Sequence, residues 1–311
     1  MPSWFQAATG VALTAWLALA ASGAVPFPRW IAARQADTPV ELEQQVSAAS
    51  DLWRRSVDAI AAARGVRPDE ALIGGEWTPL VTTLGEVEAK RVSVSPAWPR
   101  ALVREFHRAG LRPGDVVAAS FSGSFPGINL AVMSASQAMG LRLVAISSVT
   151  ASSWGATDPG FTWPELEVRL DAAGVLRRAT VAVSAGGDGD RALDLDDEGR
   201  SLARAIAAQC AGQLRARLVE PADFESAIRT RLEAFDAARG GRPIAAFVNV
   251  GGTEAALGRS PAILTVQNGW LGNEPFDSSP GRGLVARMVE QGVPVLHILN
   301  VRGLAVRWGI L

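Results

Sequence analysis

The sequence is poor in the side chains that form disulfides or bind transition metals. Cys210 is the only cysteine, which excludes an internal disulfide and a cysteine-based zinc site. The only two histidines, His107 and His297, lie far apart in the chain, so we expect no histidine-rich metal site. An oxygen-ligated Mg²⁺ or Ca²⁺ stays open. We assign no residue to a metal and predict no cofactor.

A surplus of charge of either sign is also absent. The chain carries 30 Lys and Arg against 31 Asp and Glu, for a net charge of −1. Proteins that bind nucleic acids in general carry a basic surplus that neutralises phosphates, so no nucleic-acid partner is expected. With 311 residues, of which 48% are hydrophobic, the chain can bury a sizeable core.

Lysine is nearly missing, because Lys90 is the single lysine among the 30 basic residues. An ammonium is compact and can lose its proton, which a guanidinium does not do, so the lysine indicates a special role. If "EAK" is extended, Glu88 and Lys90 lie on one face and share a pocket. Such a pair is either a structural ion pair or a catalytic one, in which burial lowers the pKa of the lysine and activates a serine.

Charge is missing altogether from residues 4–25, "WFQAATGVALTAWLALAASGAV". About 20 apolar residues cross a bilayer as a helix, so residues 1–28 are predicted to be a membrane anchor, with a cleaved signal peptide as the alternative. Apolar residues recur at helical spacing over 38–64, which predicts that residues 29–65 form a juxtamembrane helical linker. Residues 66–311 are then the globular domain.

Apolar runs alternate with helical patterns through the rest of the chain. This alternation is typical of an α/β fold with a parallel or mostly parallel sheet flanked by helices, in three Rossmann-like layers. The predicted strands cover 116–119, 142–147, 180–183, 245–250 and 294–298, and the predicted helices cover 127–139, 163–173, 196–212, 222–238 and 281–291.

Three loops rich in Ser, Thr and Gly follow predicted strands, at 120–129, 147–163 and 248–258. Ligands of parallel sheets gather at the carboxyl ends of the strands, where helix N-termini can bind anions. We therefore predict that these loops bind substrate carboxylates, although small residues that only allow close packing are the alternative. The predicted binding residues are Ser122, Gly123, Asn129, Ser147, Ser148, Trp154, Asn249, Gly251 and Gly252.

The predicted catalytic residues are Ser124, Lys90, Glu88 and Asp158. Ser124 only loosely fits the Gly-x-Ser-x-Gly hydrolase turn, and it needs a base. His107 is expected at the surface and His297 in the core, which leaves Lys90. Asp158 precedes a proline, so turn formation is the alternative for it. The acidic stretch 188–199 lacks the spacing of a calcium loop and is expected to be solvated, with Asp196 capping a helix.

Four motifs of the chain resemble those of the bacterial poly-gamma-glutamate system protein family. These are "EAK" at 88–90, "SGSFPGIN" at 122–129, "ASSWGATDPGFTW" at 151–163 and "VNVGG" at 248–252. The resemblance implies a membrane-anchored accessory protein of poly-gamma-glutamate synthesis or export, with the membrane subunits of the synthase as partners. It also implies a single-pass protein of the cell membrane with its domain on the extracytoplasmic side.

Taken together, these features predict a protein that binds glutamyl carboxylates and acts on the polymer as a hydrolase or transferase. One alternative is a scaffold subunit of the synthase without enzymatic activity. Another is a serine and lysine hydrolase unrelated to the polymer. Arg29 and Arg34 follow the apolar segment and by the positive-inside rule favour a cytoplasmic domain, against the resemblance.

Overall fold

The computed structural model describes residues 38–311. The predicted membrane segment and the first part of the linker lie outside this range. Within residues 38–311, no helix combines the length and the apolar composition needed to cross a membrane.

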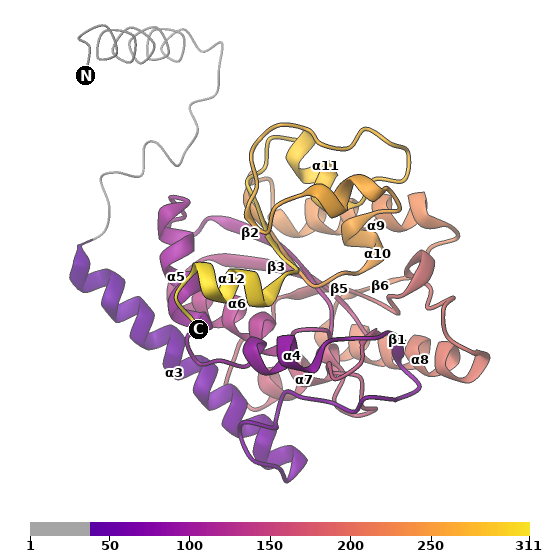
Figure 1. Ribbon diagram of the computed structural model, residues 1–311, viewed down its shortest axis with the longest axis horizontal. Coiled ribbons are helices and arrows are strands. Elements are labelled where there is room, and N and C mark those ends of the chain that lie inside the picture. Colours follow the sequence, from indigo (N-terminus) through magenta and orange to yellow (C-terminus); the bar gives the residue numbers. More distant parts are fainter. Residues whose placement is uncertain (1–37) are drawn as a thin grey trace, which may run out of the picture.

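A seven-stranded, mostly parallel sheet forms the centre of the molecule (Figure 1). Six strands are parallel and β8 pairs antiparallel with β9. The predicted α/β architecture is confirmed, since all five predicted strands are present. In spatial order the strands are β6 (Arg217–Val219), β5 (Thr180–Ser184), β3 (Arg142–Ser148), β2 (Val116–Phe121), β7 (Ile244–Val250), β9 (Val295–Ile298) and β8 (Gly269–Trp270).

Helices cover both faces of this sheet, because successive residues of each strand are apolar and point to opposite sides. In β2, Val117 and Ala119 belong to one core, while Val116 and Ala118 belong to the other. The first face carries α3 (Pro39–Arg64), α5 (Trp98–Arg108), α6 (Pro126–Ala138), α7 (Trp163–Ala172) and α8 (Asp197–Leu214). The second carries α9 (Phe224–Arg239), α10 (Glu254–Leu257) and α11 (Leu284–Glu290).

The predicted linker helix is present as α3. Thr38 and Glu41 form a capping box at its start, and Gly65 ends it in the left-handed conformation. Its buried face packs against α5 and α6, and the indole Nε1 of Trp53 donates to the carbonyl oxygen of Gly127 at 2.9 Å. Residues 39–64 are therefore part of the packed α/β domain.

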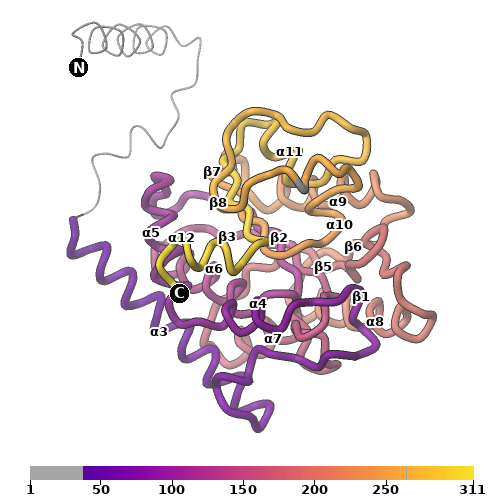
Figure 2. Tube along the Cα trace, viewed as in Figure 1, coloured from indigo at the N-terminus to yellow at the C-terminus, as the bar shows by residue number. Residues whose placement is uncertain are grey.

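The C-terminal helix packs on the side of the molecule that the first helices of the domain form. Figure 2 shows the C-terminal α12 (Val301–Arg307) returning to the side built from the first helices of the domain. It contacts α4 (Val87–Ser93), and the rings of Trp308 and Trp98 meet edge to face with centroids 5.7 Å apart.

Strand connections run outward in opposite directions from the centre of the sheet. From β2 the chain moves through β3 to β5 and β6 with helices on one face, and from β7 it moves to β9 with helices on the other. The direction changes between β2 and β7, where the loops at the carboxyl ends separate and leave a crevice. A two-stranded parallel sheet, β1 (Val81–Thr83) with β4 (Ala151–Ser152), lies beside this edge.

Candidate functional site

A cavity of about 400 Å³ opens at the carboxyl ends of the strands. Residues from five separate segments line it, and the most frequent kind among them is a hydroxyl side chain: Thr82, Thr83, Ser122, Ser124, Thr150, Ser152 and Thr253. Ligand sites of doubly wound sheets lie at this position. The cavity therefore marks the candidate functional site.

Lys90, Ser152 and Ser124 form a continuous chain of polar atoms beside this cavity. The Nζ atom of Lys90 donates to Ser152 Oγ at 2.7 Å and to the carbonyl oxygen of Ser124 at 2.5 Å. Ser152 Oγ lies 3.1 Å from Ser124 Oγ, which also accepts the backbone N–H of Ser152 at 3.2 Å. The hydroxyl of Ser152 thus lies within hydrogen-bond reach of both the Lys90 amine and the Ser124 hydroxyl.

The ammonium of Lys90 lies in surroundings that disfavour its charge. The side chain is only 2% exposed, and burial lowers its pKa from 10.5 to about 7. Within residues 38–311, no carboxylate forms an ion pair with it. The ring of Phe125, with its centroid 4.5 Å from Nζ, is a weaker partner for the charge than a carboxylate. Lys90 can therefore exchange a proton near neutral pH.

The expectation that Glu88 shares the pocket of Lys90 is wrong. Residues 87–93 form helix α4, in which positions two apart point to different sides, so the interpretation as an extended segment fails. Glu88 is exposed and pairs with Arg91. The lysine instead turns inward between the loops after β2 and β3.

Close backbone packing shapes the loop that carries Ser124. Gly251 has φ of 89°, and a Cβ there would lie 2.2 Å from Ser122 Oγ. Ser122 Oγ accepts the N–H of Ser124 at 3.2 Å, while Asn129 Nδ2 donates to the Ser122 carbonyl oxygen at 2.8 Å. A Cβ at Gly123 would meet the carbonyl oxygen of Ala156 at 2.8 Å, so Gly123 allows two loops to pack rather than a ligand to approach.

The remaining predicted binding residues divide between the cavity and the core. Gly252 lines the cavity. Ser147 is buried under α7, where its Oγ contacts Thr180 Oγ1 and accepts Trp163 Nε1. Asn249 is also buried, and its Nδ2 contacts the Gly251 carbonyl oxygen and His297 Nδ1. These two residues therefore position strands and loops.

Asp158 and Trp154 hold the loop at 147–163 against the end of α3 and the segment that follows it. Asp158 pairs with Arg64 at the end of α3 at 2.7 Å and accepts the N–H of Gly75. The backbone of Trp154 exchanges hydrogen bonds with residues 74 and 75. Neither residue lines the cavity, so the catalytic role predicted for Asp158 has no geometric support.

Both histidines and the cysteine lie apart from the three-residue chain of Lys90, Ser152 and Ser124. His297 is in the core, as expected, and burial lowers its pKa to about 4. His107, on α5, contacts Gln45 of α3. Cys210 is buried in the core between α8 and the sheet. In residues 38–311, no group of three or more His, Cys, Asp or Glu side chains is arranged to hold a metal ion.

Sequence reasoning missed Ser152 and the acidic side of the cavity. Asp188 and Asp194 reach it from the loop after β5, and Glu254 reaches it from α10. The glycine-rich run "AGGDGD" directly after a predicted strand was a signal for this loop. The expected helix cap at Asp196 is confirmed, since its Oδ1 accepts the N–H of Gly199 at 2.8 Å.

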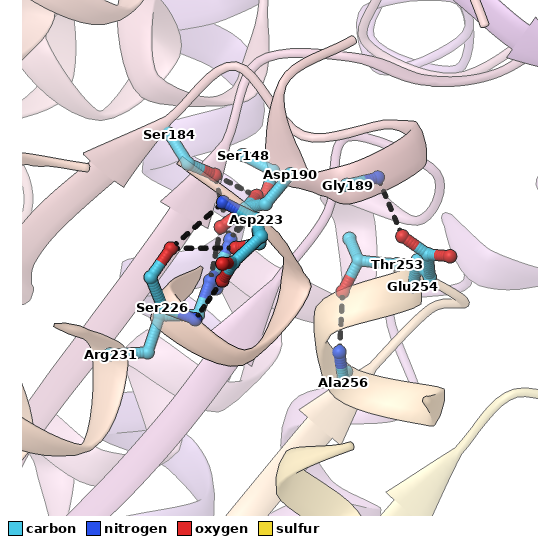
Figure 3. Close-up of polar contacts among 10 residues, drawn as sticks. All are labelled: Ser148, Ser184, Gly189, Asp190, Asp223, Ser226, Arg231, Thr253, Glu254 and Ala256. Atoms are coloured by element: carbon cyan, nitrogen blue, oxygen red, sulfur yellow. Dashed lines mark hydrogen bonds and ion pairs between the residues drawn. The ribbon is translucent and has the colours of Figure 1, made fainter. Parts of the chain in front are cut away.

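A buried arginine anchors the loop after β5 to the sheet (Figure 3). Arg231 of α9 forms two hydrogen bonds of 2.7 Å with the carboxylate of Asp190. Its Nη2 also donates to the hydroxyls of Ser184 at 2.7 Å and of Ser148 at 3.1 Å. Ser148, predicted to bind substrate, therefore binds this arginine.

A second cavity, of about 460 Å³, lies at the opposite, amino edge of the sheet. Mostly apolar atoms of the α5 end, Trp270 and Leu271 line it, and no serine or lysine of residues 38–311 is among its lining residues. The groups able to carry out nucleophilic chemistry are at the carboxyl edge, which we regard as the functional one.

Comparison with known proteins yields no relative: no protein-family model, no curated protein and no solved structure matches the chain. The function is therefore inferred from the residues and geometry of the chain itself.

Proposed function

We propose that the protein is a serine and lysine acyl transferase or hydrolase that acts on amide bonds. Ser124 is the nucleophile, Ser152 relays the proton and Lys90 is the base. One observation carries the proposal: a buried amine without a carboxylate partner lies 2.7 Å from Ser152 Oγ, which lies 3.1 Å from Ser124 Oγ. Activation of a serine by a lysine of lowered pKa is an established form of nucleophilic catalysis.

The first half of the reaction forms an ester on Ser124. Neutral Lys90 accepts the proton of Ser152 while Ser152 accepts that of Ser124, and Ser124 Oγ forms a bond to the amide carbon. The backbone N–H of Ser152, 3.2 Å from Ser124 Oγ, stabilises negative charge on that oxygen as the proton leaves. The carbon–nitrogen bond then breaks, and the leaving amine receives the proton that Lys90 returns through Ser152.

The second half releases the acyl group. Water or a second amine loses a proton to Lys90 and attacks the ester, and Ser124 regains its proton as the carbon–oxygen bond breaks. Water gives hydrolysis, whereas an amine gives transfer.

The gamma-glutamyl amide is the substrate that the sequence resemblance favours. The four motifs that carry the resemblance include Lys90 and Ser124 and run through Ser152. On this basis the protein is an accessory component of poly-gamma-glutamate biosynthesis. It is anchored by residues 1–28, faces the extracytoplasmic side and works beside the synthase subunits.

Defined gamma-linked glutamate oligomers test the proposal when incubated with the full-length protein and followed by mass spectrometry. We expect cleavage or transfer, and labelling of Ser124 by a fluorophosphonate probe. Ser124→Ala should abolish both, and Lys90→Met should lower kcat by about 10²–10⁴-fold, as expected for loss of a general base. Ser201→Ala, on the exposed surface of α8, is the matched control.

Two results would contradict the proposal. One is unchanged turnover by Ser124→Ala. The other is the absence of both turnover and probe labelling in the wild-type protein, which favours the scaffold alternative.

A further inference from the structure

The wall of the cavity formed by the loop after β5 and by α10 is acidic. Asp188, Asp194 and Glu254 line it, and in the described part of the chain no lysine or arginine is among the cavity-lining residues. We call these three residues the acidic wall. They share one cavity with Ser124 and Ser152, so a substrate held at the serines meets this charge.

The acidic wall keeps an excess of negative charge. Arg259 is the cation beside it, with Nε 2.6 Å from Glu254 Oε1 and Nη2 3.1 Å from Asp188 Oδ1. Glu254 also accepts the N–H of Gly189 at 2.6 Å, as Figure 3 shows. Asp194 accepts the N–H of Asp188 at 3.1 Å and forms no ion pair within the described part of the chain. Three carboxylates thus face one guanidinium.

A buried hydroxyl of the same cavity provides an independent sign of a ligand. Thr150 lines the cavity and is only 2% exposed, yet its Oγ1 has no hydrogen-bond partner among residues 38–311. Buried polar groups of native proteins are nearly always hydrogen-bonded, and an unpaired one is costly. A polar group of a bound molecule would satisfy it.

We propose that the acidic wall binds the free ammonium group of the substrate, so that the enzyme acts at the amino end of an amide-linked chain. This inference rests on the proposed function and names its substrate class. A carboxylate surplus attracts an ammonium and repels an anion. Internal residues of a gamma-linked polyglutamate chain carry a carboxylate and no ammonium, whereas the amino-terminal residue carries an ammonium beside its carboxylate.

This proposal differs from the prediction that the loops bind substrate carboxylates at a helix N-terminus. At the start of α6 the Ser124 carbonyl oxygen is bound to Lys90, and Ser122 Oγ accepts the N–H of Ser124. The cavity wall opposite carries the wrong sign for an anion.

A pair of substrates that differ only at the amino end tests the inference. A gamma-linked glutamate tetramer with a free amino end should be turned over with a kcat/KM at least about tenfold above that of its N-acetylated form, because acetylation removes the charge that the wall attracts. Asp188→Asn and Asp194→Asn should each raise KM for the free form and reduce the ratio of kcat/KM between the free and the acetylated form. Asp197→Asn, exposed at the start of α8, removes the same charge away from the cavity and is the control.

Binding to the Ser124→Ala variant, measured by calorimetry, separates this inference from the proposed function. Equal binding and equal turnover of the two tetramers would overturn the inference and leave the acyl-transfer mechanism standing. Preferential binding of the free form, with no turnover by the wild type and no probe labelling of Ser124, would support the ammonium site and overturn the catalytic proposal. Absence of binding to either tetramer would overturn the inference.

Discussion

Lys90 is buried and forms no ion pair with a carboxylate of residues 38–311, so in the proposed mechanism its protonation state decides whether Ser124 can react. Burial places its pKa at about 7, and only the neutral amine accepts a proton. Activity on an amide substrate should therefore rise with pH, with an apparent pKa of about 7 in kcat/KM. A pH–rate profile checks this, and a profile flat between pH 5.5 and 8.5 would argue against lysine as the base.

The same lysine should make stability depend on pH. Its pKa is about 7 in the fold, below the usual 10.5, so between these values the unfolded chain binds more protons and stability rises with pH. The free-energy cost of burying the positive charge of Lys90 applies in full below pH 7 and disappears above pH 10.5, where the amine is neutral in both states. We expect the free energy of unfolding of wild type relative to Lys90→Met to increase by up to about 1.4 kcal/mol per pH unit in this window. Urea unfolding at pH 6.5, 8 and 9.5 measures it, and a constant difference would contradict the shift.

Gly251 is needed for the loop that positions Ser122. Its φ of 89° strains any other residue, and an added Cβ would clash with Ser122 Oγ. Gly251→Ala should destabilise the fold by about 1–3 kcal/mol and lower kcat, since Ser122 holds the N–H of Ser124. Gly212→Ala is the matched control, because a Cβ there meets open space within α8 and should stabilise by about 0.5–1 kcal/mol. Thermal unfolding of the two variants compares them, and equal melting temperatures would refute the argument.

Among the elements, α3 matters because it covers the first face of the sheet and supports the start of α6. Trp53 packs in the core and donates to the carbonyl of Gly127, three residues after Ser124. Trp53→Ala should cost about 3–5 kcal/mol of stability. Trp77, which is 71% exposed, serves as control, and Trp77→Ala should change stability by less than about 0.5 kcal/mol. Denaturant unfolding gives both values, and a small effect at Trp53 would mean that α3 is not part of the cooperative unit.

At the scale of the whole molecule, Arg231 connects α9 on one face of the sheet to β3, β5 and the loop after β5. Arg231→Met would leave the carboxylate of Asp190 buried without a partner, at a cost of about 3–5 kcal/mol. Adding Asp190→Asn should recover part of that loss, because the buried charge is removed. Arg217→Met breaks an exposed pair with Glu233 and should cost less than about 1 kcal/mol. A double-mutant cycle measures the coupling free energy between Arg231 and Asp190. A value near zero would show that this pair does not connect α9 to the loop after β5.

Long periodic patterns in the sequence predicted most of the fold. Each of the five predicted strands and five predicted helices has a counterpart, because runs of four or more apolar residues and helical repeats are strong signals. The strands β1, β4, β6 and β8 were missed, since segments of two or three residues carry no measurable period. The helix α4 was misread as extended because a seven-residue helix spans only two turns.

The sequence alone determined the α/β class, the position of the loops at the strand ends and the singular status of Lys90. These are local properties, set by composition and by the spacing of apolar residues. The tertiary structure decided which hydroxyls meet the amine. Ser152 lies 62 residues from Lys90, and their contact depends on β4 pairing with β1 and on the inward turn of α4. The acidic wall likewise brings together residues 188, 194 and 254 through the order of strands in the sheet. Contacts between segments distant in the chain depend on the packing of the whole core, for which a single sequence has no local signal.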